Sequence, residues 1–255
     1  MTLRVVITGA SSGLGRALAA EYARRGATLG LMARRLEALR ELASELKVRS
    51  VHYALDVRDA PALANAANDF VAAFGSPEIV IANAGVSSGT SSERNEDRAV
   101  FQEIMDINVV GMLNTFQPFI RPMRGAGNGT LVGIASVAGF RGMPGSGAYS
   151  ASKAAAIAYL ESLRVDLRGS GISVVTICPG YIATPMTQSN RFPMPFIISA
   201  ESAAARMANA IERRPRFTVI PWQMGVIGAV LKMLPRPLYD GVFTRAPRKA
   251  RRTSD

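Results

Sequence analysis

Tyr149 and Lys153 are the two residues of this sequence whose types and spacing point most directly to chemistry. Side chains four residues apart on a helix share one face, so a helix here would place the phenol beside the ammonium. The pKa of a free phenol is about 10, and a neighbouring positive charge lowers it by favouring the phenolate. We therefore expect this pair to exchange a proton with a substrate oxygen near neutral pH.

A glycine-rich segment near the amino terminus is suited to a nucleotide. Gly9, Gly13 and Gly15 follow an apolar run, residues 3–8, and open an amphipathic stretch, residues 13–25. Small residues there let the backbone approach a pyrophosphate, and the helix N-terminus offers free N–H groups and a positive dipole end. The spacing is G-x3-G-x-G, and a plain tight turn is the alternative. A nucleotide site and a proton donor in one chain predict hydride transfer.

The second strand-like run, residues 28–33, ends at the point that chooses between NAD and NADP. An acidic residue there would accept hydrogen bonds from both ribose hydroxyls and favour NAD, but this sequence has Arg34 and Arg35. The guanidinium of Arg34 can bind a 2′-phosphate through two hydrogen bonds. We therefore predict NADP(H) as the cofactor. The alternative is that both arginines are surface charges at the start of a helix.

Composition excludes several other kinds of site. The 255 residues are 48% apolar and 19% charged, which is ordinary for a globular enzyme with a sizeable core. The single histidine, His52, and the single cysteine, Cys178, lie far apart. They leave no intrachain disulfide and exclude most zinc sites and histidine-based triads, so we predict no metal and expect Cys178 to be a packed core thiol. No signal peptide or spanning segment is recognisable, which favours a cytoplasmic location.

Short apolar runs alternate with helix-length amphipathic stretches along the chain. The predicted strands are residues 3–8, 28–33, 48–55, 78–82, 130–135, 172–178 and 217–220. The predicted helices are residues 13–25, 36–46, 60–74, a long one over 98–123 with a bend near Pro118, 148–168 and 201–213. Strands separated by helices form parallel crossover units, so we predict a doubly wound α/β fold with about seven parallel strands and helices on both faces.

Together these segments resemble the short-chain dehydrogenase/reductase family. The matching residues stand in the family's order and at its usual intervals: Thr8-Gly9-Ala10-Ser11-Ser12-Gly13-Leu14-Gly15, Asp56, Asn83-Ala84-Gly85, Asn108, Ser136, Tyr149, Lys153, Pro179-Gly180 and Thr184. The resemblance covers residues 3–221 and implies a Rossmann-like fold. Some NADP-using members carry a basic residue just before the second glycine, where this sequence has Ser12, so the NADP prediction depends mainly on Arg34.

The resemblance also implies four catalytic residues. Tyr149 would give its proton to a carbonyl oxygen or take one from an alcohol, and Lys153 would bind the nicotinamide ribose and lower the pKa of Tyr149. Ser136 would hydrogen-bond the substrate oxygen, and Asn108 would hold a water linking Lys153 to solvent. Alternatives are a capping role for Ser136 and a helix-distorting structural role for Asn108. The implied cofactor-binding residues are Gly9, Ser11, Ser12, Gly13, Leu14, Gly15, Arg34, Asp56, Val57, Asn83, Ala84, Gly85, Tyr149, Lys153, Pro179, Gly180, Ile182 and Thr184.

The last third of the chain bears on substrate and partners. In the family, residues 185–198 would form a mobile flap over the substrate. Their Met, Phe and Ile side chains favour an apolar substrate, with ordinary lid packing as the alternative. We expect residues 1–221 to form one dinucleotide-binding and catalytic domain, to which residues 222–255 add an apolar helix and a basic tail. That helix could lie at a membrane interface or pack on the flap or on another subunit.

The charge of the chain does not by itself identify a partner. The net charge is +11, and five of the last eleven residues are basic. We interpret them first as a frayed, solvated tail, and second as a contact for anionic lipid or an acidic carrier. Nucleic acid is not expected as a partner, because no nucleic-acid-binding motif accompanies the charge.

These observations predict an NADP(H)-dependent carbonyl reductase, or the reverse alcohol dehydrogenase, acting on an apolar small-molecule substrate, either a ketone or a lipid-like compound. By resemblance we also expect a homo-oligomer, either a dimer or a tetramer. A non-catalytic NADP-binding regulatory protein with the same fold is the main alternative. An epimerase or dehydratase is another, although 255 residues leave little room for the larger substrate domain that such chains carry.

Overall fold

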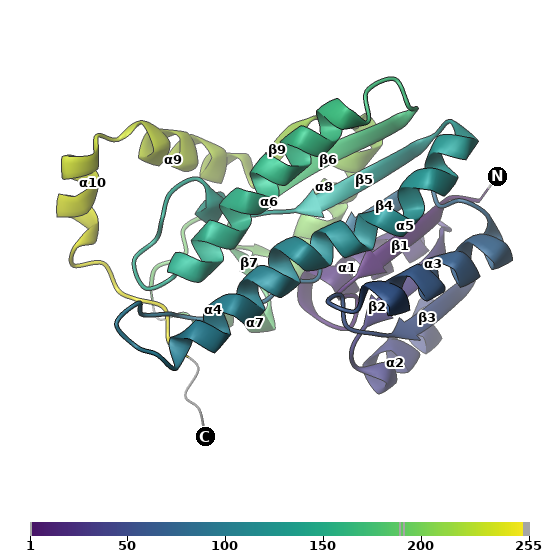
Figure 1. Ribbon diagram of the computed structural model, residues 1–255, viewed down its shortest axis with the longest axis horizontal. Helices are drawn as coiled ribbons and strands as arrows, with labels where there is room; N and C mark the ends of the chain where they lie inside the picture. Colours follow the sequence, from purple (N-terminus) through teal and green to yellow (C-terminus); the bar gives the residue numbers. More distant parts are fainter. Residues whose placement is uncertain (1, 189, 191, 252–255) are drawn as a thin grey trace.

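A seven-stranded parallel sheet forms the centre of the molecule, with the strand order β3-β2-β1-β4-β5-β6-β9 (Figure 1). The computed structural model describes residues 2–188, 190 and 192–251. The strands are β1 (Arg4–Thr8), β2 (Thr28–Ala33), β3 (Ser50–Ala54), β4 (Ile79–Ala82), β5 (Gly129–Ile134), β6 (Ile172–Pro179) and β9 (Phe217–Ile220). Every neighbouring pair in this sheet is parallel, so the predicted doubly wound α/β fold is confirmed.

Helices cover both faces of the sheet and bury two separate apolar layers against it. The helices of one layer are α1 (Gly13–Arg24), α2 (Leu36–Leu46) and α8 (Ala200–Arg213). Those of the other are α3 (Ala60–Phe74), α5 (Gly111–Ala126) and α6 (Gly147–Asp166). Both faces of the central strands are therefore covered, and β2, for example, is buried at every position.

The long helix predicted over residues 98–123 is divided differently from the prediction. It consists of α4 (Asp97–Met105), a π-helical turn η1 (Asp106–Val110) and α5, and α5 continues through Pro118 and Pro122. The departure from α-helical geometry therefore lies at η1 and not at Pro118. Its cause is tertiary, since Asn108 in η1 is hydrogen-bonded to two other parts of the chain.

Smaller elements complete the edge of the sheet where the strands end. A 3-10 turn, η2 (Val137–Gly139), follows β5, and a two-stranded sheet joins β7 (Ile182–Ala183) to β8 (Ile198–Ser199) on either side of α7 (Pro185–Gln188).

Cys178 in β6 is fully buried, and burial raises its pKa to about 12, so the prediction of a packed core thiol is confirmed. Among the described residues, no helix combines the length and the apolarity needed to cross a bilayer.

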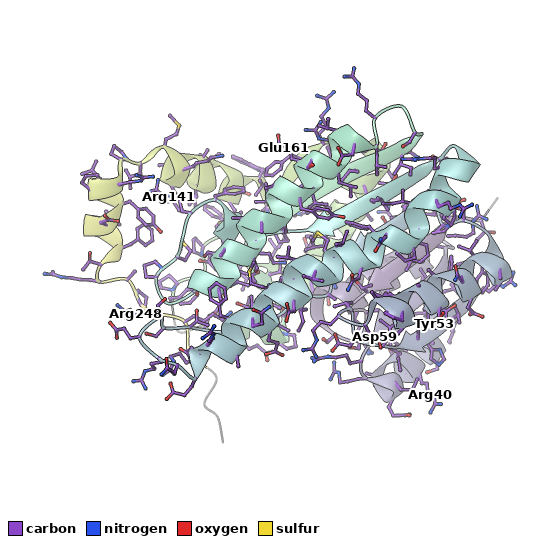
Figure 2. All side chains as sticks on the ribbon, viewed as in Figure 1. Arg40, Tyr53, Asp59, Arg141, Glu161 and Arg248 are labelled. Atoms are coloured by element: carbon purple, nitrogen blue, oxygen red, sulfur yellow. The ribbon has the colours of Figure 1, made fainter. Side chains whose placement is uncertain are left out.

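The chain beyond β9 forms α9 (Trp222–Met233) and α10 (Arg236–Phe243), which extend away from one end of the sheet (Figure 1). Arg141, labelled in Figure 2, ties them back: its guanidinium donates to the carbonyl oxygen of Leu234 at 3.0 Å and lies 4.2 Å from the centre of the Tyr239 ring. After α10 the chain returns toward α4, where Arg251 forms a bridge with Gly89. The expectation of a frayed tail is therefore wrong for the segment that ends at Arg251, although Arg245, Arg248 and Arg251 are exposed to solvent as expected; Arg252 lies outside the described residues.

Candidate active site

A cleft of about 380 Å³ opens at the carboxyl edge of the parallel strands. In such a sheet the loops that follow neighbouring strands meet at this edge, which is where ligands bind. All the residues predicted to bind cofactor or to act in catalysis line this cleft except Asn108, which lies behind it. The structure thus brings the separate sequence motifs together in one place.

The glycine-rich loop between β1 and α1 has a backbone that only glycine accommodates. Gly9 and Gly13 have φ angles of +69° and +52°, in the left-handed region. A Cβ added at Gly15 would lie 2.1 Å from the carbonyl oxygen of Gly9, so the helix starts in direct contact with the loop. Ser12 is the N-cap of α1, and its side chain makes no capping hydrogen bond. The first N–H groups of the helix therefore have no side-chain cap and suit an anion such as a pyrophosphate.

Asn83 fastens the end of β4 to this loop. Its side-chain nitrogen donates to the carbonyl oxygens of Thr8 and Gly9 at 3.0 and 3.3 Å, and its backbone N–H donates to the Thr8 hydroxyl at 3.2 Å. Asn83 therefore holds the glycine loop in place at the edge of the cleft. Ala84 belongs to the same clamp, because its N–H also donates to the Thr8 hydroxyl.

The two arginines after β2 lie beside the glycine loop. Arg34 lines the cleft, and the guanidinium of Arg35 donates to the carbonyl oxygen and the hydroxyl of Ser11 at 3.2 and 3.3 Å. The sequence prediction did not include Arg35, although its position next to Arg34 was a usable signal. Asp56 is held by two side-chain hydrogen bonds from Arg58, which lower the pKa of its carboxyl group despite partial burial. Arg34, Arg35 and Ser11 therefore line the same end of the cleft.

Tyr149 and Lys153 project into the cleft from the first two turns of α6. The Lys153 ammonium lies 5.8 Å from the centre of the Tyr149 ring and donates to the carbonyl oxygen of Ile134 at 2.9 Å. Burial lowers the pKa of Lys153 to about 8. For Tyr149, burial raises the pKa, and a hydrogen bond from the Ser136 hydroxyl opposes the rise.

The sequence predicts that Lys153 lowers the pKa of Tyr149, but in this structure the net shift of that pKa is upward, because burial outweighs the groups that favour the phenolate. The phenol loses more hydration on burial than its neighbours restore. The Lys153 ammonium hydrogen-bonds the Ile134 carbonyl oxygen and also lies near the Tyr149 ring. Tyr149 is accordingly a neutral phenol at neutral pH, which is the form that can donate a proton.

Asn108 and Ser136 both have structural partners in addition to their places near the cleft. The Asn108 amide accepts from Val86 N–H at 2.8 Å and donates to the Val86 carbonyl oxygen at 3.0 Å and the Ser152 hydroxyl at 2.9 Å. It therefore links η1, the loop after β4 and α6, while its oxygen keeps one lone pair for a further donor. Ser136 caps η2 by accepting from Ala138 N–H at 3.1 Å. The catalytic roles of Asn108 and Ser136 stay predictions.

The flap predicted over residues 185–198 borders the other side of the cleft. Pro185, Met186 and Thr187 line it, and the Thr187 hydroxyl donates to the Ile182 carbonyl oxygen at 2.6 Å. Pairing of β7 with β8 closes the base of the flap. Residues 189 and 191 of the predicted flap lie outside the described part of the chain.

Comparison with known proteins identifies the family to which the chain belongs. Residues 4–194 match the sequence profile described as short chain dehydrogenase. A protein of Myxococcus xanthus described as an oxidoreductase is 41% identical over 243 residues, covering 94% of this chain and 96% of the relative. The chain belongs to the short-chain dehydrogenase family. The resemblance found in the sequence is thus confirmed, and this short-chain dehydrogenase is an oxidoreductase.

Two further proteins similar to this chain are reductases of different substrates. A sulfoacetaldehyde reductase of Chromohalobacter salexigens is 38% identical over 190 residues, covering 73% of this chain and 75% of the relative. The solved structure of L-sorbose reductase from Gluconobacter frateurii, complexed with NADPH and L-sorbose, has a TM-score of 0.78 and 25% identity. That match covers 86% of this short-chain dehydrogenase and 95% of the reductase.

Proposed function

We propose that this short-chain dehydrogenase transfers a hydride between NADP(H) and a carbonyl or alcohol substrate with apolar surface beside the reacting carbon. The observation that carries the proposal is that Tyr149, Lys153 and Ser136 line the same cleft as the glycine-rich loop. A proton donor and a nucleotide cradle in one cleft are what hydride transfer to a carbonyl requires.

The residues present fit a dinucleotide of this kind. The uncapped N-terminus of α1 would hold the pyrophosphate, and Lys153 would bind the nicotinamide ribose. Arg34 and Arg35, with the Ser11 hydroxyl, would bind a 2′-phosphate, which favours NADP(H) over NAD(H). When bound, the cofactor supplies or accepts the hydride.

The protein's own part in the reaction is proton transfer and positioning. In reduction, the Tyr149 phenol donates its proton to the substrate oxygen while the hydride adds to the carbonyl carbon, so that an alcohol and a phenolate result. The Lys153 ammonium stabilises that phenolate, and its pKa of about 8 keeps it charged at neutral pH. The Ser136 hydroxyl orients the carbonyl oxygen beside the phenol.

Apolar side chains support the substrate part of the proposal. Val86, Ile182 and Met186 line the cleft, and Phe196 and Ile197 are exposed on the flap. These side chains would gain by covering an apolar substrate, since burial of apolar surface contributes about 25 cal/mol per Å². We also propose a homo-oligomer, as the exposed apolar side chains of α9 and α10 support.

The test is a panel of carbonyl compounds with NADPH consumption as the readout, spanning short ketones, aldehydes, acyl thioesters, steroids and long-chain ketones. We expect turnover with the wild-type protein and a loss of about 100- to 10,000-fold in Tyr149→Phe, because the phenol proton is removed. NADPH binding, followed by calorimetry, should change little. Tyr159→Phe is the matched control, since Tyr159 lies on the same helix but outside the cleft.

Two results would contradict this function. One is a Tyr149→Phe variant that keeps most of the wild-type activity. The other is a wild-type protein that binds NADPH but reduces none of the carbonyl classes, which would favour the non-catalytic alternative.

A further inference from the structure

The last described residues, 248–251, form what we call the C-terminal strap. Figure 1 shows the chain leaving α10 and running back to α4, and Figure 2 labels Arg248 on this segment. The strap is fixed at its end: Arg251 donates to both oxygens of the Asp97 carboxylate, at 2.7 and 2.9 Å, and the carbonyl oxygen of Ala250 accepts from Gly89 N–H at 2.9 Å. The Asp97 residue is only 4% exposed, whereas the Arg251 side chain is 34% exposed, so the carboxylate of this ion pair is buried and the guanidinium reaches solvent.

The strap packs closely against two loops, each of which has a glycine at the point of contact. A Cβ added at Gly89, in the loop after β4, would lie 2.2 Å from the carbonyl oxygen of Lys249. A Cβ added at Gly145, before α6, would lie 2.7 Å from the Cβ of Arg248, and Gly145 has a φ angle of +70°. The strap is therefore packed between the loop that follows Val86 and the loop that precedes Tyr149.

This packing brings the ammonium of Lys249 to the catalytic tyrosine. The Lys249 Nζ lies 5.8 Å from the centre of the Tyr149 ring, the same distance as the Nζ of Lys153, and donates to the Ser87 hydroxyl at 2.7 Å. Lys249 is partly buried, and within the described chain its ammonium makes no ion pair with a carboxylate. An ammonium carries three donors, so two are left for another acceptor.

A partly desolvated cation without a counter-ion is costly unless an anion binds beside it. We propose that Lys249 is a specificity-determining residue, which binds an anionic group (carboxylate, sulfonate or phosphate) carried by the carbonyl substrate. The inference rests on the proposed function and refines it: the substrate's body lies against the apolar flap, and its anionic group lies within a few bonds of the carbonyl. That short separation is needed because the carbonyl oxygen and the anionic group must both reach groups at the same tyrosine ring.

The kinetic test compares two substrates that differ only in the anion, 4-oxobutanoate and its methyl ester, both reduced with NADPH. Lys249→Met keeps the length of the side chain and should lower kcat/KM for the carboxylate by about 10- to 100-fold, as expected for loss of a charge-assisted hydrogen bond. The ester should be affected far less, and Lys249→Arg should restore most of the carboxylate's kcat/KM. Arg248→Met is the matched control, because this exposed neighbour on the strap should leave the ratio of the two substrates unchanged.

A binding measurement keeps the inference separate from the proposed function. With NADP⁺ present, malonate should bind to the wild-type protein in calorimetry, malonamide should not, and Lys249→Met should weaken malonate by about tenfold or more. If no carbonyl is reduced but malonate binding follows this pattern, the proposed function fails and the anion site stands. Equal losses for carboxylate and ester, a general gain in activity in Lys249→Met, or malonate binding that ignores the substitution would each overturn the inference.

Discussion

At the scale of single residues, four cations in or near the cleft lie in three different environments. Arg34 and Arg35 are exposed to solvent beside Ser11, Lys153 is buried at the cleft wall, and Lys249 is partly buried beside the tyrosine ring. An exposed guanidinium keeps its charge under all ordinary conditions and suits a phosphate that is always ionised. A buried ammonium is more sensitive to its surroundings, and the lowered pKa of Lys153 shows this directly.

The arginines give a prediction for cofactor choice. Arg34→Ala should lower kcat/KM for NADPH by about 10- to 100-fold while NADH is little affected, because a charge-assisted hydrogen bond to phosphate is lost. Steady-state kinetics with both cofactors measures the change. Arg40→Ala is the control: Arg40, labelled in Figure 2, is an exposed residue of α2 that pairs with Glu37. A wild-type protein that uses NADH as well as NADPH would show that these arginines do not select the cofactor.

At the scale of elements, the site depends on how α1, η1 and α6 are held against the ends of the strands. The glycine loop allows α1 to begin directly behind β1, and Asn108 in η1 joins α6 to the loop after β4. A π-helical turn at this point brings one side chain to both neighbours, which is consistent with the frequent use of such turns at functional sites. The hydrogen bonds of Asn108 therefore go with both the π-helical turn and the attachment of α6 beside the cleft.

The start of α1 gives a prediction about a single added methyl group. In Gly15→Ala, the new Cβ would meet the Gly9 carbonyl oxygen and the Asn83 side chain, so α1 must move away from the loop. We expect NADPH affinity to fall by at least about tenfold and the melting temperature to drop by several degrees, as for other strained core substitutions. Calorimetry and thermal unfolding measure the two effects.

Gly125→Ala is the control for this substitution. Gly125 is also a helical glycine, in α5, and a Cβ there would meet nothing within 4 Å. Alanine is the better helix former by about 1 kcal/mol, so this variant should be as stable as the wild type or more so. Unchanged NADPH binding in Gly15→Ala would mean that contact between the loop and the helix is not needed for the cofactor.

At the scale of the whole molecule, the C-terminal segment has two different surfaces. One side contacts the rest of the molecule: Tyr239 packs against Arg141 and donates to the Gly142 carbonyl oxygen, and Arg251 of the strap pairs with Asp97. The other side leaves large apolar side chains exposed on α9 and α10: Trp222, Val226, Val230, Met233, Leu238 and Val242. An apolar surface of this kind indicates a contact with another surface, and we propose that this is a second copy of the chain.

The oligomer is tested by charging this surface. Val226→Asp combined with Val230→Asp places two carboxylates on one face of α9 and should convert the wild-type oligomer to a smaller species in light scattering. Val165→Asp is the control, because Val165 is an equally exposed valine (60%) on α6. Two results would favour the membrane alternative. One is a wild-type protein that is monomeric. The other is a wild-type protein that floats with anionic liposomes while a chain ending at residue 221 does not.

The sequence by itself determined most of the elements, the parallel arrangement of the main strands and the larger part of the cleft lining. These features follow from local patterns: apolar runs define strands, a glycine turn defines a loop, and spacing of four residues puts Tyr149 and Lys153 on one face of a helix. Because strand ends meet at one edge of a parallel sheet, residues such as Ser11, Asp56 and Asn83 could be assigned to one site from chain order alone.

Only the tertiary structure decided the features that depend on contacts between distant segments. The placement of Lys249 beside Tyr149 requires the chain to return past α10, and no spacing in the sequence encodes that path. The π-helical turn at Asn108 depends on hydrogen bonds to Val86 and Ser152. The raised pKa of Tyr149 depends on burial, which is a property of the packed molecule and cannot be deduced from the identity of its nearest charged neighbour.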